Sequence, residues 1–372
     1  MIPYSKPYIS DSDIQLVSSS LMQAKISGDG KYTYLATNLL DSILSAKTLL
    51  TTSCTDALEM SAILANIKDG DEAIIPSYTF VSTALPFELR GAKIIFADSE
   101  FDRPHADIDH ILSLISKKTK AIVLVHYAGE SADIIRLKNN IDQSIFLIED
   151  NAQGINSKNL NNYLGTIGNL GTISFHDTKN IISGEGGALI INDLNLINRA
   201  EIIREKGTNR SSFFRGEVDK YGWVDIGSSF LPPEMVAALL YSQLQNINYI
   251  QEKRLKIYNK YLKSLSILNK KNILTPIIKN YSTGNGHIYY LVCRNLEERT
   301  KYIEFMKLNN ICCVSHYISL HNSKYFSHKY SGKPLLNSDK FTDCLVRLPA
   351  FVDITEEQQN LIINKTIEFF RI

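Results

Sequence analysis

The segment GTISFHDTKNIISGEGGALIIN (171–192) contains two apolar runs separated by a short polar loop. GTISF (171–175) leads into the loop and GALIIN (187–192) follows it. Apolar runs without polar alternation are typical of strands buried on both faces of a sheet. The loop holds a single lysine, Lys179, ahead of a glycine-rich end. An ordinary surface lysine and a lysine used in chemistry both fit this local pattern, so the rest of the chain has to decide between them.

Similar apolar runs recur between about Leu49 and Asp193, where they alternate with longer helical patterns. This alternation predicts an α/β fold in which helices cover a mostly parallel sheet. The segment SCTDALEMSAILANI (53–67) has helical spacing and begins with a Ser/Thr/Asp cluster suited to a helix N-terminus. The predicted strands are LLTT (49–52), EAIIP (72–76), AKIIFAD (92–98), KAIVLVHY (120–127), SIFLIED (144–150), GTISF (171–175) and GALIIN (187–192).

The C-terminal half of the chain has a different pattern. The charged segment 199–206 is followed by a long irregular stretch rich in aromatic residues and glycine, and such stretches are often functional. MVAALLYSQLQNINYIQEKRLKIYNKYLKSL (235–265) reads as one long helix that links two domains. We therefore expect a large α/β domain at 1–245, including the N-terminal segment, and a smaller α+β domain at 246–372.

Composition excludes several classes of protein. The 372 residues include 40 basic and 39 acidic side chains, a net charge of +1 that gives no reason to expect nucleic acid or an anionic membrane as a partner. No apolar run approaches the ~20 residues needed to span a bilayer, and the first residues lack the pattern of a signal peptide. Five cysteines without CxxC spacing argue against a disulfide framework and a structural metal. We expect a cytoplasmic protein.

Residues that follow parallel strands are candidate site residues, because ligands bind outside the carboxyl ends of such strands. Cys54 and Thr55 follow the first strand at a helix start, which favours an anion, although a plain N-cap fits equally well. Phe80 follows the second strand and is either a core residue or a stacking surface. Asp150 ends the fifth strand, where a buried acid is costly without a positive partner, although a helix cap is also possible.

Ser174 and Lys179 follow the sixth strand at the same edge of the sheet. A phosphate cradle, a flat aromatic ring, a buried carboxylate and a lysine are together what pyridoxal 5′-phosphate requires. The chain has neither GxGxxG nor GxxxxGK[ST], so a dinucleotide-binding dehydrogenase or a P-loop enzyme is poorly supported. The combination favours pyridoxal phosphate chemistry at Lys179.

The sequence resembles the DegT/StrS family of fold-type I sugar aminotransferases over almost its full length. The resemblance implies a pyridoxal phosphate fold with a seven-stranded, mostly parallel sheet and a smaller α+β C-terminal domain. The blocks that carry it are LLTTSCTDALEM, PSYTFVSTA, LRGAKIIF, VHYAG, IEDNAQG, LGTIGNLGTISFHDTKN, GEGGA, INDLNLINRAEIIREKGTNRSSFFRG and DIGSS.

The resemblance also implies roles for individual residues around the cofactor. Lys179 would carry the internal aldimine and Asp150 would face the pyridinium nitrogen. Gln153 would lie near the phenolic oxygen of the ring. The remaining cofactor contacts implied are Phe80, which would stack on the ring, and Cys54, Thr55 and Ser174, which would hold the phosphate.

Three further residues are implied by the resemblance at the edges of this site. Ser229 matches a position where many relatives carry an asparagine that reaches the cofactor phosphate of the neighbouring subunit, so a homodimer with shared active sites is implied. His316 and His321 fall where the C-terminal domain of the family closes over the substrate. A structural role for either histidine is equally compatible with the sequence.

The resemblance is greatest to the branch that makes dTDP-4-amino-4,6-dideoxy-D-galactose for enterobacterial common antigen. It implies amination of dTDP-4-keto-6-deoxy-D-glucose at C4, with L-glutamate as amino donor. The gluco epimer, used in O-antigen synthesis, and a C3-aminated product are alternatives. A sugar dehydratase is disfavoured because those relatives replace the lysine with histidine, and a non-catalytic pyridoxal phosphate-binding protein is disfavoured by Lys179 and Asp150.

Overall fold

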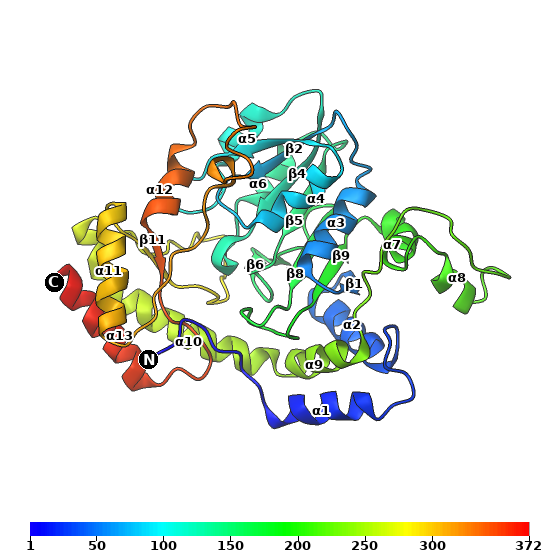
Figure 1. Ribbon diagram of the computed structural model, residues 1–372, viewed down its shortest axis with the longest axis horizontal. Helices are drawn as coiled ribbons and strands as arrows, with labels where there is room; N and C mark the ends of the chain where they lie inside the picture. Colours follow the sequence, from blue (N-terminus) through cyan, green and yellow to red (C-terminus); the bar gives the residue numbers. More distant parts are fainter. Residues whose placement is uncertain (372) are drawn as a thin grey trace.

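A seven-stranded sheet forms the centre of the computed structural model, which describes residues 1–371 (Figure 1). The strands lie in the order β1-β9-β8-β5-β4-β2-β3, and all neighbours are parallel except the two pairs that involve β9. The predicted mostly parallel sheet of a pyridoxal phosphate fold is confirmed, and each predicted strand corresponds to one strand of the sheet. These strands are β1 (Lys47–Thr51), β2 (Glu72–Pro76), β3 (Lys93–Ala97), β4 (Thr119–Val125), β5 (Phe146–Asp150), β8 (Leu170–Ser174) and β9 (Gly187–Ile191).

Helices cover both faces of the sheet, as the alternation of apolar side chains along each strand requires. Leu49 and Ile148 point into the layer formed with α3, α4 and α7, whereas Leu50 packs against α2 and α9 on the opposite face. Leu147 packs on that opposite face as well, with α5 and α6. The helices of this part are α1 (Asp11–Leu21), α2 (Lys31–Leu44), α3 (Cys54–Leu64), α4 (Leu85–Leu89), α5 (Ile108–Leu114), α6 (Ile134–Asn139), α7 (Ile197–Arg204), α8 (Arg210–Phe214) and α9 (Glu234–Gln245).

The predicted single helix over 235–265 is wrong, because the chain forms two helices, α9 and α10 (Ile247–Leu265), that meet at Asn246. The Asn246 side chain donates a hydrogen bond to the carbonyl oxygen of Ser242 at 3.1 Å. Local bonds of this kind compete with the helical ladder. Since α10 packs against both the sheet core and the C-terminal core, the division at 245/246 stays a prediction.

The C-terminal part has its own core between a two-stranded antiparallel ladder and three helices. Tyr289, Tyr302 and Ile362 are fully buried in this core. Ile2 also packs into this core, and its N–H donates to the carbonyl oxygen of Asn310 at 2.7 Å. The assignment of the N-terminal segment to the large domain stays a prediction. The further elements are β6 (Lys158–Asn159) and β7 (Asn162–Tyr163), a small hairpin beside the sheet, and β10 (Tyr290–Val292), β11 (Leu345–Arg347), α11 (Leu296–Leu308), α12 (Leu336–Cys344) and α13 (Glu356–Phe370).

A buried acid joins the sheet to the C-terminal part. Glu130 follows β4, and its carboxyl group accepts a hydrogen bond from the hydroxyl of Tyr258 on α10 at 2.6 Å. Its second oxygen has no partner among residues 1–371. Burial raises the pKa of Glu130 to about 7. The folded protein therefore holds a proton at Glu130 at a pH where the unfolded chain has released it.

This raised pKa makes the free energy of unfolding depend on pH. Because the folded pKa lies above the unfolded value, the contribution of Glu130 to stability is largest below about pH 4.5 and is lost as pH rises through about 7. We expect this group to lower the free energy of unfolding by about 3 kcal/mol between pH 4.5 and 8. Denaturant titrations across this range should show a weaker loss in Glu130→Gln, and an unchanged pH dependence would contradict the assignment. Exposed Glu252→Gln is the matched control.

Candidate active site

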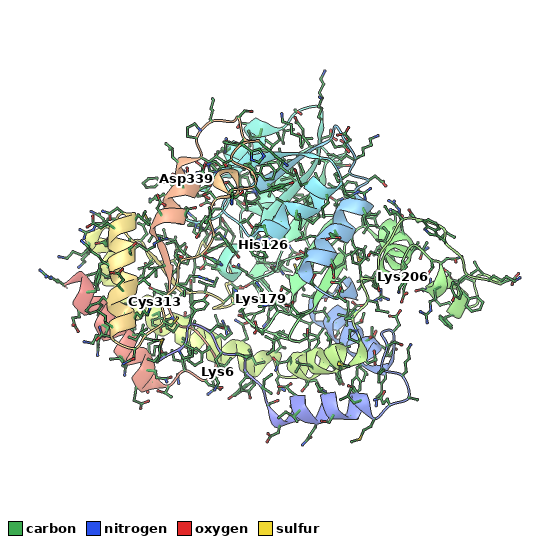
Figure 2. The ribbon with its side chains drawn as sticks, viewed as in Figure 1. Lys6, His126, Lys179, Lys206, Cys313 and Asp339 are labelled. Carbon is green, nitrogen blue, oxygen red and sulfur yellow. The ribbon has the colours of Figure 1, made fainter. Side chains whose placement is uncertain are left out.

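A cavity of about 740 Å³ lies at the carboxyl ends of the strands, between the sheet and the C-terminal part. Lys179 lies near the middle of the molecule (Figure 2). Eight of the residues singled out from the sequence line the cavity, although they come from five separate segments of the chain. They are Cys54, Thr55, Phe80, Asp150, Gln153, Ser174, Lys179 and His316.

The N-terminus of α3 forms one wall of this cavity. The side chain of Ser53, the N-cap residue, accepts a hydrogen bond from the N–H of Asp56 at 3.1 Å. The N–H groups of Cys54 and Thr55 have no backbone or side-chain acceptor in the described chain. A Cβ on Gly187 would lie 2.4 Å from the nitrogen of Cys54, so only glycine lets the strand approach this turn. Free donors at a helix start fit a phosphate group.

Asp150 presents a buried carboxylate at the end of β5, with 5% of its surface exposed. One oxygen accepts a hydrogen bond from the hydroxyl of Thr83 at 2.7 Å. The other accepts from the N–H of Ala152 at 3.2 Å. Both donors are neutral, so this carboxylate can pair with a cationic group in the cavity.

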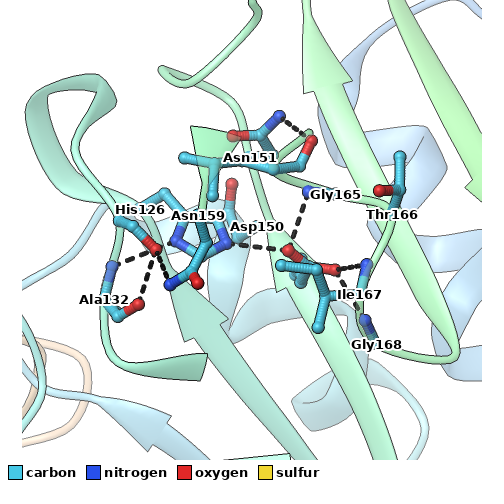
Figure 3. Close-up of polar contacts among 12 residues, drawn as sticks. His126, Ala132, Asp150, Asn151, Asn159, Gly165, Thr166, Ile167 and Gly168 are labelled. Carbon is cyan, nitrogen blue, oxygen red and sulfur yellow. Dashed lines mark hydrogen bonds and ion pairs between the residues drawn. The ribbon is translucent and has the colours of Figure 1, made fainter. Parts of the chain in front are cut away.

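The preceding residue, Glu149, anchors the same strand end from its other face. Its carboxylate lies 2.9 Å from Nε2 of His126, and both side chains are fully buried. It also accepts hydrogen bonds from the backbone N–H groups of Gly165, Ile167 and Gly168 at 2.6–2.7 Å. Figure 3 shows the dashed contacts made by His126, Gly165, Ile167 and Gly168. Four donors thus fix the end of β5 beside the cavity.

Lys179 opens onto the cavity from the loop between β8 and β9, and none of the described residues forms an ion pair with its amino group. Desolvation by burial lowers the pKa of Lys179, and the negative charge of Asp150 opposes this only in part. The backbone N–H of Lys179 donates to the carbonyl oxygen of His176 at 2.9 Å, which holds the loop in a tight turn. A larger fraction of this amine is therefore neutral than in an exposed lysine at the same pH.

Gln153 and Phe80 both lie beside Tyr317 in the cavity wall. The amide of Gln153 donates to the hydroxyl of Tyr317 at 2.9 Å and accepts from the N–H of Ala128 at 2.6 Å. Phe80 lies 6.1 Å from the ring of Tyr317, measured between ring centroids. The amide of Gln153 is therefore fixed at both its oxygen and its nitrogen, whereas Phe80 lines the cavity with 54% of its surface exposed.

The three residues predicted at the edges of the site have different positions. Nδ1 of His316 lies 2.6 Å from the hydroxyl of Tyr127, and burial lowers the pKa of this imidazole well below its usual range. His321 does not reach the cavity: it is 3% exposed and its Nδ1 lies 2.7 Å from the hydroxyl of Ser77. Ser229 is exposed and also lies outside the cavity. Its predicted role requires a second subunit.

The structure adds lining residues that the sequence did not single out. Arg347, Tyr4 and His287 all contribute to the wall. The ring of His287 lies 2.9 Å from the side-chain oxygen of Asn180, the residue directly after Lys179. No local motif marks these residues, because each depends on how the C-terminal part and the N-terminal segment pack over the sheet.

The cavity fits pyridoxal phosphate on the chemistry of its donors: free N–H groups at α3, a buried carboxylate and an amine with a lowered pKa. Together with the sheet order, this arrangement defines a fold-type I aminotransferase. Among the described residues, none of the helices has the length and apolarity to cross a membrane.

The chain belongs to the DegT/DnrJ/EryC1/StrS aminotransferase family, whose model matches residues 7–366. It is 28% identical to GDP-perosamine synthase of Escherichia coli O157:H7 over 99% of this chain and 98% of the relative. It is also 28% identical to the UDP-4-amino-4-deoxy-L-arabinose–oxoglutarate aminotransferase of Shewanella sediminis, over 95% and 94% of the two chains. The solved structure of Spr1654 from Streptococcus pneumoniae, PMP-form, has a TM-score of 0.92 at 22% identity and covers 100% and 99%.

Family membership confirms two of the sequence-based predictions. The protein is an aminotransferase, and its cofactor is pyridoxal 5′-phosphate.

The lowered pKa of Lys179 predicts selective reaction with the cofactor's aldehyde. Borohydride reduction after incubation with equimolar pyridoxal phosphate at pH 8 should place a stable adduct on the peptide that contains Lys179. Exposed lysines such as Lys6 should stay largely unmodified. Peptide mass spectrometry measures the distribution, with Lys179→Ala as the control. An adduct spread evenly over surface lysines would contradict the prediction.

Proposed function

We propose that this protein is a nucleotide-sugar aminotransferase that converts dTDP-4-keto-6-deoxy-D-glucose to dTDP-4-amino-4,6-dideoxy-D-galactose. L-Glutamate is the proposed amino donor and leaves as 2-oxoglutarate. The observation that carries the proposal is the cavity in which Lys179, Asp150 and the free N–H groups of α3 meet. The dTDP nucleotide and the galacto epimer are supported by the sequence resemblance.

Bound pyridoxal phosphate supplies an electron sink that makes the bonds at an amino-bearing carbon labile. Lys179 would hold it covalently and would move the proton at the reacting carbon, since its amine opens onto the cavity. Asp150 would keep the ring nitrogen protonated through its buried negative charge. Gln153 would contact the phenolic oxygen, and Phe80 would stack on the ring.

The phosphate would be held by the N–H groups at the start of α3 together with Thr55, Ser174 and Cys54. Burial raises the pKa of the Cys54 thiol, so this side chain stays neutral beside the anion. His316, neutral and at the cavity wall, would contact the sugar.

The names of two relatives support a nucleotide-linked sugar as acceptor and amination at C4. One relative is named for a GDP-linked sugar and the other for a UDP-linked 4-amino sugar with oxoglutarate as co-substrate. The nucleotides in these two names differ from each other, so the names do not indicate which nucleotide this protein uses. The dTDP nucleotide is supported only by the sequence resemblance in the blocks around Lys179 and Ser229.

The proposed product is tested by incubating the protein with pyridoxal phosphate, L-glutamate and dTDP-4-keto-6-deoxy-D-glucose, and by determining the product with NMR. An axial amine at C4 is expected, since the orientation of the sugar at Lys179 decides which face receives the proton. An equatorial C4 amine would change only the assigned epimer, from galacto to gluco, and would leave the proposed reaction at C4 intact.

Two results would contradict the proposed reaction: a C3 amine, or turnover of a UDP- or GDP-linked ketosugar with none of the dTDP-linked one.

Lys179→Ala should abolish turnover and keep the wild-type melting temperature, because the side chain contributes little to the core. Addition of glutamate should bleach the visible absorbance of the bound cofactor in an aminotransferase. The absorbance of a non-catalytic cofactor-binding protein should stay unchanged.

We also propose a homodimer in which each subunit completes the other's site. The segment that includes α8 projects from the body of the molecule beyond α7 (Figure 1). It exposes large apolar side chains, with Trp223 85% and Phe214 70% exposed. Exposed aromatic residues on a projecting segment are typical of a surface that binds a partner. Ser229 lies at the base of this segment, where it would reach the neighbour's phosphate.

Substituting a charge at the centre of this surface should separate the subunits. Trp223→Glu is expected to give a monomer in sedimentation velocity and to lose at least tenfold in activity, since a desolvated carboxylate opposes association. The matched control is Leu308→Glu on α11, because Leu308 is equally exposed but lies on the C-terminal part. A wild-type monomer with full activity would overturn the proposal.

A further inference from the structure

The imidazole of His316 lies at the cavity wall with one ring nitrogen engaged. Its Nδ1 lies 2.6 Å from the hydroxyl oxygen of Tyr127. Its Nε2 has no hydrogen-bond partner among residues 1–371. A neutral imidazole carries one ring proton, which sits on either nitrogen. The partner of Nδ1 therefore decides whether Nε2 offers a donor or an acceptor to a ligand.

Neighbouring aromatic rings hold this imidazole in one orientation. The ring of Tyr317 is stacked on it, with 3.5 Å between centroids and an interplanar angle of 24°. The ring of Tyr127 lies 5.4 Å away and is fully buried. Tyr127 is itself packed against Tyr78 and Tyr290, at centroid distances of 5.8 and 5.9 Å. The imidazole is thus constrained on its face by one tyrosine and at Nδ1 by another.

Both members of the hydrogen bond are uncharged at neutral pH. Burial lowers the pKa of His316 well below its usual range, and the positive charges of Arg347 and Lys179 add to this effect. Burial raises the pKa of Tyr127 well above its usual value. The hydroxyl of Tyr127 therefore keeps its proton, and the imidazole has a single proton to place.

The hydrogen bond can run in two directions, but only one of them satisfies every buried group. If Nδ1 of His316 donated to Tyr127, the hydroxyl proton of Tyr127 would have no other acceptor in the described chain. A buried donor without an acceptor costs its full desolvation. If Tyr127 donates instead, Nδ1 accepts and the ring proton lies on Nε2. The 2.6 Å separation agrees, because N–H donors usually lie about 2.7–3.2 Å from their acceptor and O–H donors lie closer.

We propose that Tyr127 is a positioning residue that fixes His316 as the Nε2–H tautomer, so that His316 donates a hydrogen bond to a ligand oxygen and does not act as a base. This inference rests on the proposed function and assigns the acceptor to an oxygen of the ketosugar. Ionised oxygens gain more from charged donors, so an uncharged N–H is best matched to a hydroxyl or carbonyl oxygen. Proton transfer at the reacting carbon is then left to Lys179.

Nuclear magnetic resonance of the holoenzyme tests the tautomer without turnover. Proton–nitrogen correlation spectra of protein with isotope-labelled histidine distinguish a protonated ring nitrogen from an unprotonated one. The signals of His316 are assigned by their loss in His316→Gln. We expect Nε2 to be protonated in the wild type and a mixture of both tautomers in Tyr127→Phe. A wild-type ring that is protonated at Nδ1 would overturn the proposal.

The two half-reactions show which substrate depends on this orientation. Stopped-flow absorbance follows bleaching of the cofactor by L-glutamate and its recovery with the dTDP-linked ketosugar. In Tyr127→Phe the half-saturating concentration of ketosugar should rise roughly 3- to 10-fold, as expected for one misdirected hydrogen bond, and that of glutamate by less than about twofold. His316→Gln keeps an N–H near the position of Nε2 and should stay within about threefold of wild type. A loss confined to the glutamate step would contradict the assigned acceptor.

A double-mutant cycle separates orientation of the imidazole from simple packing. In a His316→Ala background, Tyr127→Phe should raise the half-saturating concentration of ketosugar no further, because no imidazole is left to orient. An equal loss in both backgrounds would show that Tyr127 acts through packing alone and would overturn the proposal.

Tyr290→Phe is the matched control. The hydroxyl of Tyr290 is also buried, has no partner in the described chain and belongs to a ring packed against Tyr127. Its removal should leave the tautomer and both half-reactions unchanged, and an effect as large as that of Tyr127→Phe would count against the proposal. If the wild type does not aminate the ketosugar, the proposed substrate fails, and the resonance measurement still decides which nitrogen of His316 carries the proton.

Discussion

The buried carboxylate of Glu149 is the interaction on which the geometry of the cavity depends. Its two oxygens accept hydrogen bonds from three backbone N–H groups in the turn 165–168, and the ring of His126 lies 2.9 Å away. Each donor would cost roughly 1–3 kcal/mol if it were left buried without a partner. Adjacent side chains of a strand point to opposite faces, so anchoring Glu149 on one face also directs Asp150 toward the cavity on the other. Glu149, which lies outside the cavity, thereby positions Asp150, which lines it.

The register of the strands places the start of α3 and the loop of Lys179 at the same edge of the sheet as Asp150. Gly187 of β9 is paired with Thr51 of β1 on one side and with Ser174 of β8 on the other. This places the start of α3 beside the loop that carries Lys179, although the two are more than 100 residues apart in the chain. The close approach requires glycine, because a Cβ at this position would overlap the backbone of the α3 turn. The anion site and the reactive amine are therefore consequences of the same pairing.

The C-terminal part completes the cavity and brings a second kind of chemistry to it. The sheet supplies the groups that fit the cofactor, whereas β11 and the segment before it supply an oriented cation, Arg347, and a neutral imidazole, His316. Glu130, whose pKa burial raises to about 7, accepts a hydrogen bond from Tyr258 at the junction of the two parts. The cavity wall is thus divided between residues at the strand ends and residues of the part that packs over them.

The sequence by itself determined the sheet and several of the residues that line the cavity. Continuous apolar runs identified every strand of the central sheet, and residues at the ends of those runs, such as Asp150 and Lys179, belong to the cavity because parallel strands end at a common edge. The tertiary structure alone decided the burial of His321 away from the cavity and the presence of Arg347 in it. These features depend on contacts between segments distant in the chain, and local periodicity carries no information about such contacts.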